Sequence, residues 1–279
     1  MKAVNADLHC HSTVSDGLLA PADVVRRAKT NGVGLLALTD HDELGGLADA
    51  RAAADEVGLP FVDGVEISIS WGDDQTVHIV GLGVNPGYAA LARGLEQVRS
   101  GRDSRAGRMA AELDKAGIHG AYEGALKHVG NPALISRAHF ARYIVECGYA
   151  KDVKSVFDHW LAKGKPGYVE HSWATLEDAL GWIHDAGGVA VIAHPGRYRL
   201  SKSERMEMFA AFRDCGGEGI EVISGAHSDD EIGEYAGIAR HFGFLASRAS
   251  DFHGPGESRV DLGRLPDLPE DLIPVWSRF

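Results

Sequence analysis

The sequence predicts an α/β fold in which short apolar strands alternate with helices. Three observations support this class. Apolar runs such as residues 33–38 and 189–193 are typical of strands that are buried on both faces of a parallel sheet. Helical patterns of about ten residues separate these runs, and polar side chains follow where the strands end. A chain of 279 residues can bury a large core, either as one α/β barrel or as two smaller domains.

The strand and helix boundaries follow from local signals. Strands are expected at residues 3–6, 33–38, 61–65, 76–82, 189–193, 219–223 and 244–250. Helices are expected at residues 21–29, 47–57, 175–186, 203–215 and 229–242. Pro21 opens the first helix, and Asn31 and Gly32 close it. Thr175 is placed to cap a later helix whose first turn carries two acidic residues, which favours the helix dipole.

The alternation is interrupted between about Gly87 and Gly164, where the pattern is helical throughout. A long helix is expected from Tyr88 to Ala116 with a break near Gly101, and shorter helices at 136–147 and 153–161. Because strands and helices alternate again afterwards, we interpret residues 87–164 as an inserted helical cap. The strand-containing unit then comprises 1–86 and 165–279. The alternative is a separate domain that has no part in the site.

Composition restricts the class of protein. The apolar and charged fractions, 44% and 24%, are those of a soluble globular protein. No apolar run of membrane-spanning length and no signal pattern is visible, so we expect a cytoplasmic protein with no membrane partner. The three cysteines are far apart and odd in number, which argues against a disulfide framework. The net charge of −12 argues against long duplex nucleic acid as a partner, although bound metal ions could still attract a phosphorylated substrate.

Residues of the types that bind metal ions gather where the predicted strands end. Those residues are His9, His11, Asp40, His41, Glu66, His194, Asp251 and His253. In a strand, His9 and His11 project to one face, roughly 7 Å apart at their Cα atoms, and can converge on one cation. Asp251 and His253 repeat this spacing. His78 lies within a strand and Asp16 in the loop after the first one; the alternative for His78 is a hydrogen-bonded core histidine.

The mixture of imidazoles and carboxylates suits Zn²⁺, Mn²⁺ or Fe²⁺ better than Ca²⁺. The candidates exceed what one ion needs, which indicates two or three ions that share a carboxylate. Glu66 is the natural bridge because it is the lone acid at its strand end. Such a cluster lowers the pKa of bound water to about 7 and holds the oxygens of a phosphoryl group. No Walker loop, nucleophile elbow or dinucleotide fingerprint is present.

The ligand motifs resemble the PHP family, named for polymerase and histidinol phosphatase. The resemblance rests on residues 7–12, 39–42, 64–66, His78, 193–196 and 250–253. It implies a distorted (β/α)₇ TIM-like barrel and a site for three metal ions, most readily Mn²⁺. By this resemblance the ligand sets are His9, His11, Glu66 and Asp251 for one ion; Glu66, His78 and His194 for a second; and Asp16, His41 and His253 for a third.

Within the family, the chain resembles the stand-alone enzymes that dephosphorylate nucleoside 3′,5′-bisphosphates and trim short RNA from its 5′ end. The helical insertion, the segment 136–142 and Arg197 carry this narrower resemblance. We expect Arg137 and Arg197 to face each other across the site and to bind a second phosphate, with His139 as a further substrate-binding residue. The alternative for Arg137 is a solvated helix residue.

The candidate catalytic residues are therefore Asp40, His253, Arg137 and Arg197. The expected partner is a nucleoside bisphosphate or a short oligonucleotide, and no obligate protein partner is evident. No stripe of basic and aromatic residues for a long nucleic-acid strand is visible. Two alternatives remain: a phosphatase for a small monoester such as histidinol phosphate, and a catalytically silent partner module. The complete ligand set argues against the silent module.

Overall fold

The computed structural model describes residues 4–72 and 75–279, and within these residues seven strands form one curved sheet in chain order. The strands are β1 (Ala6–Asp7), β2 (Leu35–Leu38), β3 (Phe61–Trp71), β4 (Gln75–Leu82), β5 (Val189–Ile192), β6 (Gly219–Ser224) and β7 (Leu245–Ala249). Every predicted strand has a counterpart, but the first is shifted: β1 begins at Ala6, after Val4 and Asn5, and Ala3 lies outside the described residues. The main chain of Leu8 donates to Arg248 O at 3.0 Å, and Cys10 bridges to Phe252, so β1 and β7 nearly close the barrel.

The sheet is mixed rather than parallel throughout. β1, β2 and β3 pair in parallel, as do β5, β6 and β7, but β4 is antiparallel to both of its neighbours. The prediction that β4 is parallel was wrong, because only three residues separate β3 from β4 and a parallel pair needs a long crossover connection. β3 also continues past Glu66 to Trp71 along this hairpin, so Glu66 lies inside the strand instead of at its end.

Helices cover the outside of the barrel, close to the bounds expected from the sequence. They are α1 (Pro21–Thr30), α2 (Leu47–Val57), α8 (Leu176–Asp185), α9 (Lys202–Asp214) and α10 (Asp229–Phe242). Leu36 and Leu38 of β2 pack in the same core as α1 and α2, whereas Ala37 packs with side chains of the other strands on the opposite face. The predicted cap of α8 is confirmed, because Thr175 Oγ1 accepts a hydrogen bond from Asp178 N at 3.1 Å.

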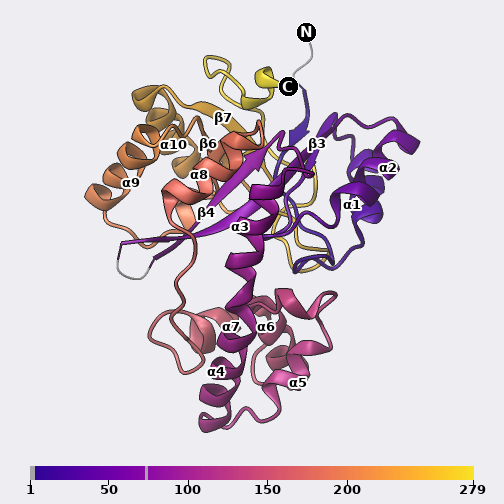
Figure 1. Cartoon of the computed structure of the whole chain (residues 1–279), viewed down its shortest axis with the longest axis vertical. Helices are drawn as coiled ribbons and strands as arrows, with labels where there is room; N and C mark the ends of the chain where they lie inside the picture. The colour runs from indigo at the N-terminus through magenta and orange to yellow at the C-terminus, as the bar shows by residue number, and fades with distance from the viewer. Residues whose placement is uncertain (1–3, 73–74) are drawn as a thin grey trace.

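The inserted segment forms a helical unit below one end of the barrel (Figure 1). Its helices, including the connecting helix, are α3 (Ala89–Ser100), α4 (Arg102–Lys115), α5 (Ala121–Leu126), α6 (Arg137–Glu146) and α7 (Val153–Val156), the last followed by a π-helical turn at Phe157–Leu161. The break at Gly101 was predicted, whereas α5 was missed. The unit has its own core, in which Leu113, Phe140 and Ile144 are fully buried.

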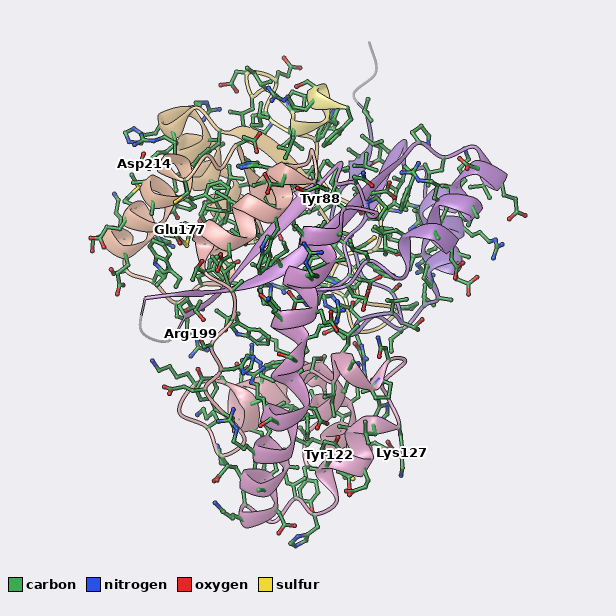
Figure 2. The ribbon with its side chains drawn as sticks, in the orientation of Figure 1. Tyr88, Tyr122, Lys127, Glu177, Arg199 and Asp214 are labelled. Atoms are coloured by element: carbon green, nitrogen blue, oxygen red, sulfur yellow. The ribbon has the colours of Figure 1, made fainter. Side chains whose placement is uncertain are left out.

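α3 connects the two units. Its side chains Leu91, Leu95 and Val98 belong to the core of the barrel, whereas Met109 of α4 belongs to that of the lower unit. Figure 2 accordingly places Tyr88, just before α3, on the upper unit and Tyr122 of α5 on the lower one. We therefore propose that the cap begins nearer Gly101 than residue 87. No helix in the described ranges has the length and apolar character needed to cross a membrane.

Candidate metal centre

A single carboxylate lies at the centre of the histidine cluster. Glu66 on β3 is fully buried, and its Oε1 atom lies 2.8 Å from His78 Nδ1 and 3.0 Å from His194 Nε2. Its Oε2 atom lies 2.8 Å from His41 Nδ1. The same oxygen lies 3.2 and 3.3 Å from the Nε2 atoms of two further histidines, His9 and His11. Five imidazoles therefore converge on two oxygens, which is more than hydrogen bonding alone accounts for.

Two aspartates flank this centre on the side of β7 and the first loop. Asp251 Oδ1 lies 3.3 Å from His11 Nε2 and 3.6 Å from His9 Nε2. Asp16 Oδ1 lies 3.5 Å from His253 Nε2 and 3.9 Å from His41 Nε2. The residues that the sequence predicted as ligands are thus brought together from six strands or strand ends and one loop.

The ligand atoms form four overlapping groups in which every atom lies within 4.8 Å of the others. These groups are His11, Asp16, His41 and His253; His9, His11 and Asp251; His9, Glu66 and His194; and His41, Glu66 and His78. Within the described residues, several buried ligand atoms make no well-aligned hydrogen bond: Asp16 Oδ1, Glu66 Oε2, His41 Nδ1, His194 Nδ1 and Asp251 Oδ1. Asp251 Oδ2 makes none either, but it lies 2.5 Å from Arg197 Nη2. Buried carboxylate oxygens without donors are costly unless a cation is bound, so this arrangement fits divalent metal ions.

Burial and mutual repulsion keep part of the cluster in the protonation state that metal binding requires. Burial, together with the neighbouring His253 and His41, lowers the pKa of His11 to about 3. Burial also lowers the pKa of His78 to about 4 in spite of the facing Glu66 carboxylate. Burial alone would raise the pKa of Glu66, but the imidazoles of His41 and His9 outweigh it and hold this pKa well below its usual range. At neutral pH the imidazoles of His11 and His78 are uncharged, so each can bind a metal ion through a nitrogen lone pair, and Glu66 is an anion.

Further residues contact the ligands and hold them in place, and they were not predicted from the sequence. Glu221 on β6 has Oε1 2.6 Å from His9 Nδ1 and accepts from His194 N through Oε2 at 2.7 Å. The Tyr198 hydroxyl donates to Ala193 O at 2.9 Å and accepts from His78 N at 2.9 Å. The contact to His9 Nδ1 fixes the orientation of that imidazole, whereas those to His194 N and His78 N position the main chain at two further ligands. The available signal was Glu221 itself, a carboxylate inside an otherwise apolar buried strand.

Within residues 4–72 and 75–279, the main chain has a positive φ at three non-glycine residues, and all three lie at the site. Asp42, His194 and Asp251 have φ values of 50°, 25° and 53°. Such conformations are uncommon away from glycine and persist where surrounding contacts impose them. For His194 and Asp251, the strained residue is itself one of the predicted ligands.

Asp40 is close to the cluster but belongs to none of the four groups. Its carboxylate accepts from Ser12 N at 2.7 Å, Ser12 Oγ at 2.6 Å and Ser15 Oγ at 2.6 Å. These contacts occupy both oxygens and hold the loop that carries Asp16. The geometry therefore favours a positioning role for Asp40 over the catalytic role suggested by the sequence.

His139 is fully buried at the start of α6, where its Nδ1 accepts from Ser136 N at 3.0 Å. This contact caps the helix, and burial lowers the pKa of His139 to about 4. Ser136 Oγ in turn donates to Asp16 Oδ2 at 3.2 Å, so the cap contacts the cluster through Ser136. Arg142 strengthens this junction: its Nη2 donates to Asp16 O at 2.5 Å and it pairs with Glu257 at 2.7 and 2.8 Å.

The two predicted substrate arginines lie on different units. Arg197, in the turn after β5, has Nη2 2.5 Å from Asp251 Oδ2, and 47% of its side chain is exposed. It therefore lies at the rim of the ligand cluster. Arg137 opens α6 in the cap, where its guanidinium lies 5.7 Å from the centre of the Phe157 ring. Burial, together with Arg102, lowers the pKa of Arg137.

The chain belongs to the PHP domain family, which matches residues 7–191. It is 53% identical to a 3′,5′-nucleoside bisphosphate phosphatase of Chromobacterium violaceum over 99% of this chain and 96% of that protein. It is 43% identical to the 5′-3′ exoribonuclease Rnm of Salmonella typhimurium, over 99% and 94% of the two chains. A solved structure described as an amidohydrolase from Chromobacterium violaceum, with bound sulfate and no metal, has a TM-score of 0.95 at 52% identity and covers 98% of this chain and 95% of that one. The family and the barrel expected from the motifs are confirmed.

Proposed function

We propose that this protein is a metal-dependent phosphoesterase that removes the 3′-phosphate from nucleoside 3′,5′-bisphosphates and leaves the nucleoside 5′-monophosphate. It would also trim short 5′-phosphorylated oligonucleotides. The observation that carries the proposal is the Glu66 carboxylate, which lies between imidazoles of two potential metal groups. The names of the two relatives, a bisphosphate phosphatase and an exoribonuclease, support this choice of substrates.

The four overlapping groups would hold two or three divalent ions, with Mn²⁺ the first candidate and Zn²⁺ or Fe²⁺ the alternatives. When bound, these ions supply positive charge to the phosphoryl oxygens and lower the pKa of a bound water. His253 lies at the partly exposed side of the cluster and would be a ligand of the same ion as Asp16 and His41. Glu221 would keep the His9 imidazole in the orientation that ligation needs and would hold the main chain at His194 in place.

The reaction joins a water oxygen to phosphorus and breaks the bond from phosphorus to the 3′-oxygen, which takes up a proton. The sequence suggested that Arg197 binds the second phosphate together with Arg137. Because its guanidinium contacts Asp251 at the rim of the cluster, we propose instead that Arg197 orients the phosphate that is cleaved. Arg137 would bind the second phosphate from the cap. A planar guanidinium suits both roles, since it pairs with two phosphate oxygens and keeps its charge.

A comparison of bisphosphate and monophosphate substrates tests this proposal. A charge-assisted hydrogen bond of about 1.5–3 kcal/mol corresponds to roughly 10- to 150-fold in kcat/KM. We expect adenosine 3′,5′-bisphosphate to exceed adenosine 3′-monophosphate by a factor in this range, and Arg137→Ala to remove most of the difference. Activity on a generic aryl phosphate should fall much less. Arg93→Ala, an exposed arginine of α3, is the matched control. If the wild-type enzyme does not prefer the bisphosphate, the alternative function, a phosphatase for small monoesters, becomes the better explanation.

A further inference from the structure

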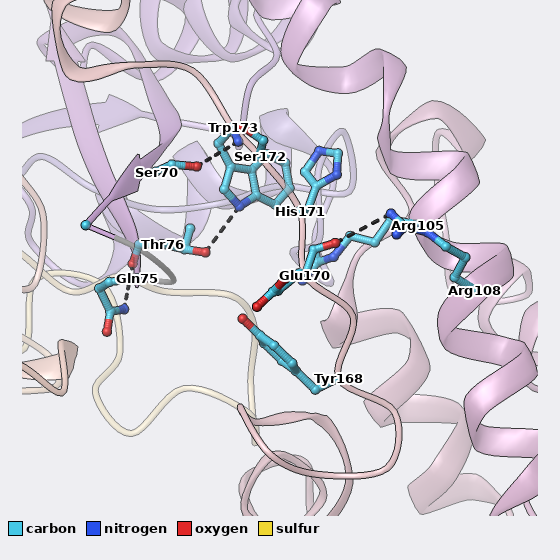
Figure 3. Close-up of a pocket in the computed structure, with 11 residues that line it drawn as sticks. Ser70, Gln75, Thr76, Arg105, Arg108, Tyr168, Glu170, His171, Ser172 and Trp173 are labelled. Carbon is cyan, nitrogen blue, oxygen red and sulfur yellow. Dashed lines mark hydrogen bonds between the residues drawn. The ribbon is translucent and has the colours of Figure 1, made fainter.

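A cavity of about 500 Å³ lies at the junction between the barrel and the cap. Four parts of the chain line it: the end of β3, the start of β4, α4 of the cap, and the segment 168–173 that returns to the barrel (Figure 3). The return segment contributes the aromatic side chains Tyr168, His171 and Trp173, and α4 contributes Arg105 and Arg108. Basic groups beside flat aromatic surfaces are the combination that binds single-stranded nucleic acid.

The cavity adjoins the metal centre along the β3–β4 hairpin. In this antiparallel pair Ser68 lies opposite His78, and Ser70 opposite Thr76, so all four share the face on which Glu66 lies. Trp173 is fixed over the second pair, since its main-chain N donates to Ser70 Oγ at 2.9 Å and its Nε1 to Thr76 Oγ1 at 3.1 Å (Figure 3). The Ser70–Thr76 pair lies two residues along the strands from the Ser68–His78 pair, which is a distance of roughly 7 Å.

Arg102 contacts one residue next to the metal centre and one that lines the cavity. Its Nη2 donates to Asp42 Oδ2, and the same carboxylate accepts from Ser68 N at 2.8 Å. The guanidinium of Arg102 lies 4.8 Å from the centre of the Trp173 ring, and that of Arg105 lies 5.3 Å from it. The arginines therefore follow one another outward from the cluster, with Trp173 beside both.

The charge of this region is unlike that of the rest of the molecule. The chain carries a net charge of −12, yet the buried Arg105 has Arg137, Arg102 and Arg108 for neighbours. Burial and the repulsion of Arg137 and Arg102 lower the pKa of Arg105 to about 9. Arg105 Nε donates to Val169 O at 3.2 Å, and Arg108 Nη2 to Glu170 O at 3.5 Å. Asp42 pairs with Arg102, and Glu170 also lines the cavity. The four arginines outnumber these two carboxylates, and a bound anion would offset the remaining positive charge.

His171 adds a neutral ring to the cavity. Its ring centre lies 4.3 Å from that of Trp173 at an interplanar angle of 75°. Burial, with Arg105 and Arg102 nearby, lowers the pKa of His171 to about 4, so the imidazole is uncharged at neutral pH. A neutral imidazole, a phenol ring and an indole together offer surfaces on which a base can stack without sequence preference.

We propose that this cavity is a subsite for the nucleotide unit that follows the terminal one, which allows the enzyme to hold a short single-stranded oligoribonucleotide. The base of this unit would stack against the aromatic residues of segment 168–173. Its 5′-phosphate is the one that is cleaved at the metal centre, so Arg105 and Arg108 would pair with the phosphate on its 3′ side. This inference rests on the proposed function, but its location comes from the cavity and not from the metal ligands.

Binding to metal-depleted protein tests the subsite without hydrolysis. The probe is a 5′-phosphorylated trinucleotide with a 3′ fluorophore, followed by fluorescence anisotropy in the presence of a chelator. We expect Kd to rise about tenfold in Arg108→Ala and in Tyr168→Ala, since phosphate pairing and stacking each contribute on that scale. Arg108 is exposed and Tyr168 partly so, which leaves the core intact. Arg93→Ala, which removes the same charge outside the cavity, should keep the wild-type Kd.

Hydrolysis separates this inference from the proposed function. With Mn²⁺ present, the ratio of kcat/KM for the trinucleotide to that for adenosine 3′,5′-bisphosphate should fall about tenfold in Arg108→Ala, on the same energetic grounds. If neither Kd nor the kcat/KM ratio changes in Arg108→Ala, the subsite proposal is wrong, whereas the bisphosphatase proposal is unaffected. Equal losses on both substrates would also overturn it, because the cavity would then bind the bisphosphate itself. Failure of the wild type to hydrolyse either substrate would count against the proposed function, and the Kd comparison would still decide the subsite.

Discussion

The substitution Glu66→Gln examines the centre of the site with little change of shape. It keeps the side-chain volume but replaces one carboxylate oxygen by an amide nitrogen, which cannot bind a cation. Glu66 belongs to two of the four ligand groups, so the substitution weakens both and leaves the two groups around His11 complete. Asp16→Asn is the matched control, because Asp16 belongs to one group only.

We expect Glu66→Gln to lower the metal content by more than one ion per chain, and Asp16→Asn by at most one. Loss of several kcal/mol of transition-state stabilisation should reduce kcat by about a thousandfold in Glu66→Gln. The assay is elemental analysis after dialysis against buffered Mn²⁺, with phosphate release from adenosine 3′,5′-bisphosphate and circular dichroism measured in parallel. If Glu66→Gln retains as much metal as Asp16→Asn, the carboxylate is not shared and the account of the centre is wrong.

Two further predictions concern the contacts around the site. Arg142→Met leaves the partly buried Glu257 unpaired and removes the donor to Asp16 O, so we expect the free energy of unfolding to fall by about 2 kcal/mol in urea titrations. A change below about 1 kcal/mol would contradict a stabilising role of this ion pair. Asp40→Ala leaves three donors from Ser12 and Ser15 without an acceptor, and we expect a loss of about 3 kcal/mol or more with less metal lost than in Glu66→Gln. A variant that loses all metal at wild-type stability would make Asp40 a ligand.

Features that depend on local pattern could be read from the sequence. Helix α2 has the predicted bounds, Leu47–Val57, because its composition and the following glycine define both ends. The approach of His9 and His11 to a common carboxylate follows from their two-residue spacing. Glu66 could be singled out because it was the lone acid near a strand end.

Features that depend on how segments pair could not be read in this way. An apolar alternation does not reveal strand direction, and only the short connection from β3 to β4 indicates that β4 is antiparallel. The role of Asp40 is determined by where the loop after β1 folds back, which no local pattern shows. The arginines beside the cavity were not recognised as a binding site, although arginines recur at every third residue from Arg99 to Arg108. The reason is that the aromatic side chains of the cavity come from residues 168–173, far along the chain.

The most direct test of the account is the product formed from adenosine 3′,5′-bisphosphate. The purified protein is incubated with this substrate and Mn²⁺, and the nucleotide product is identified by chromatography or phosphorus NMR. We expect adenosine 5′-monophosphate and one equivalent of phosphate, and neither product when a chelator replaces the metal. Formation of adenosine 3′-monophosphate, or turnover that is indifferent to the chelator, would contradict it.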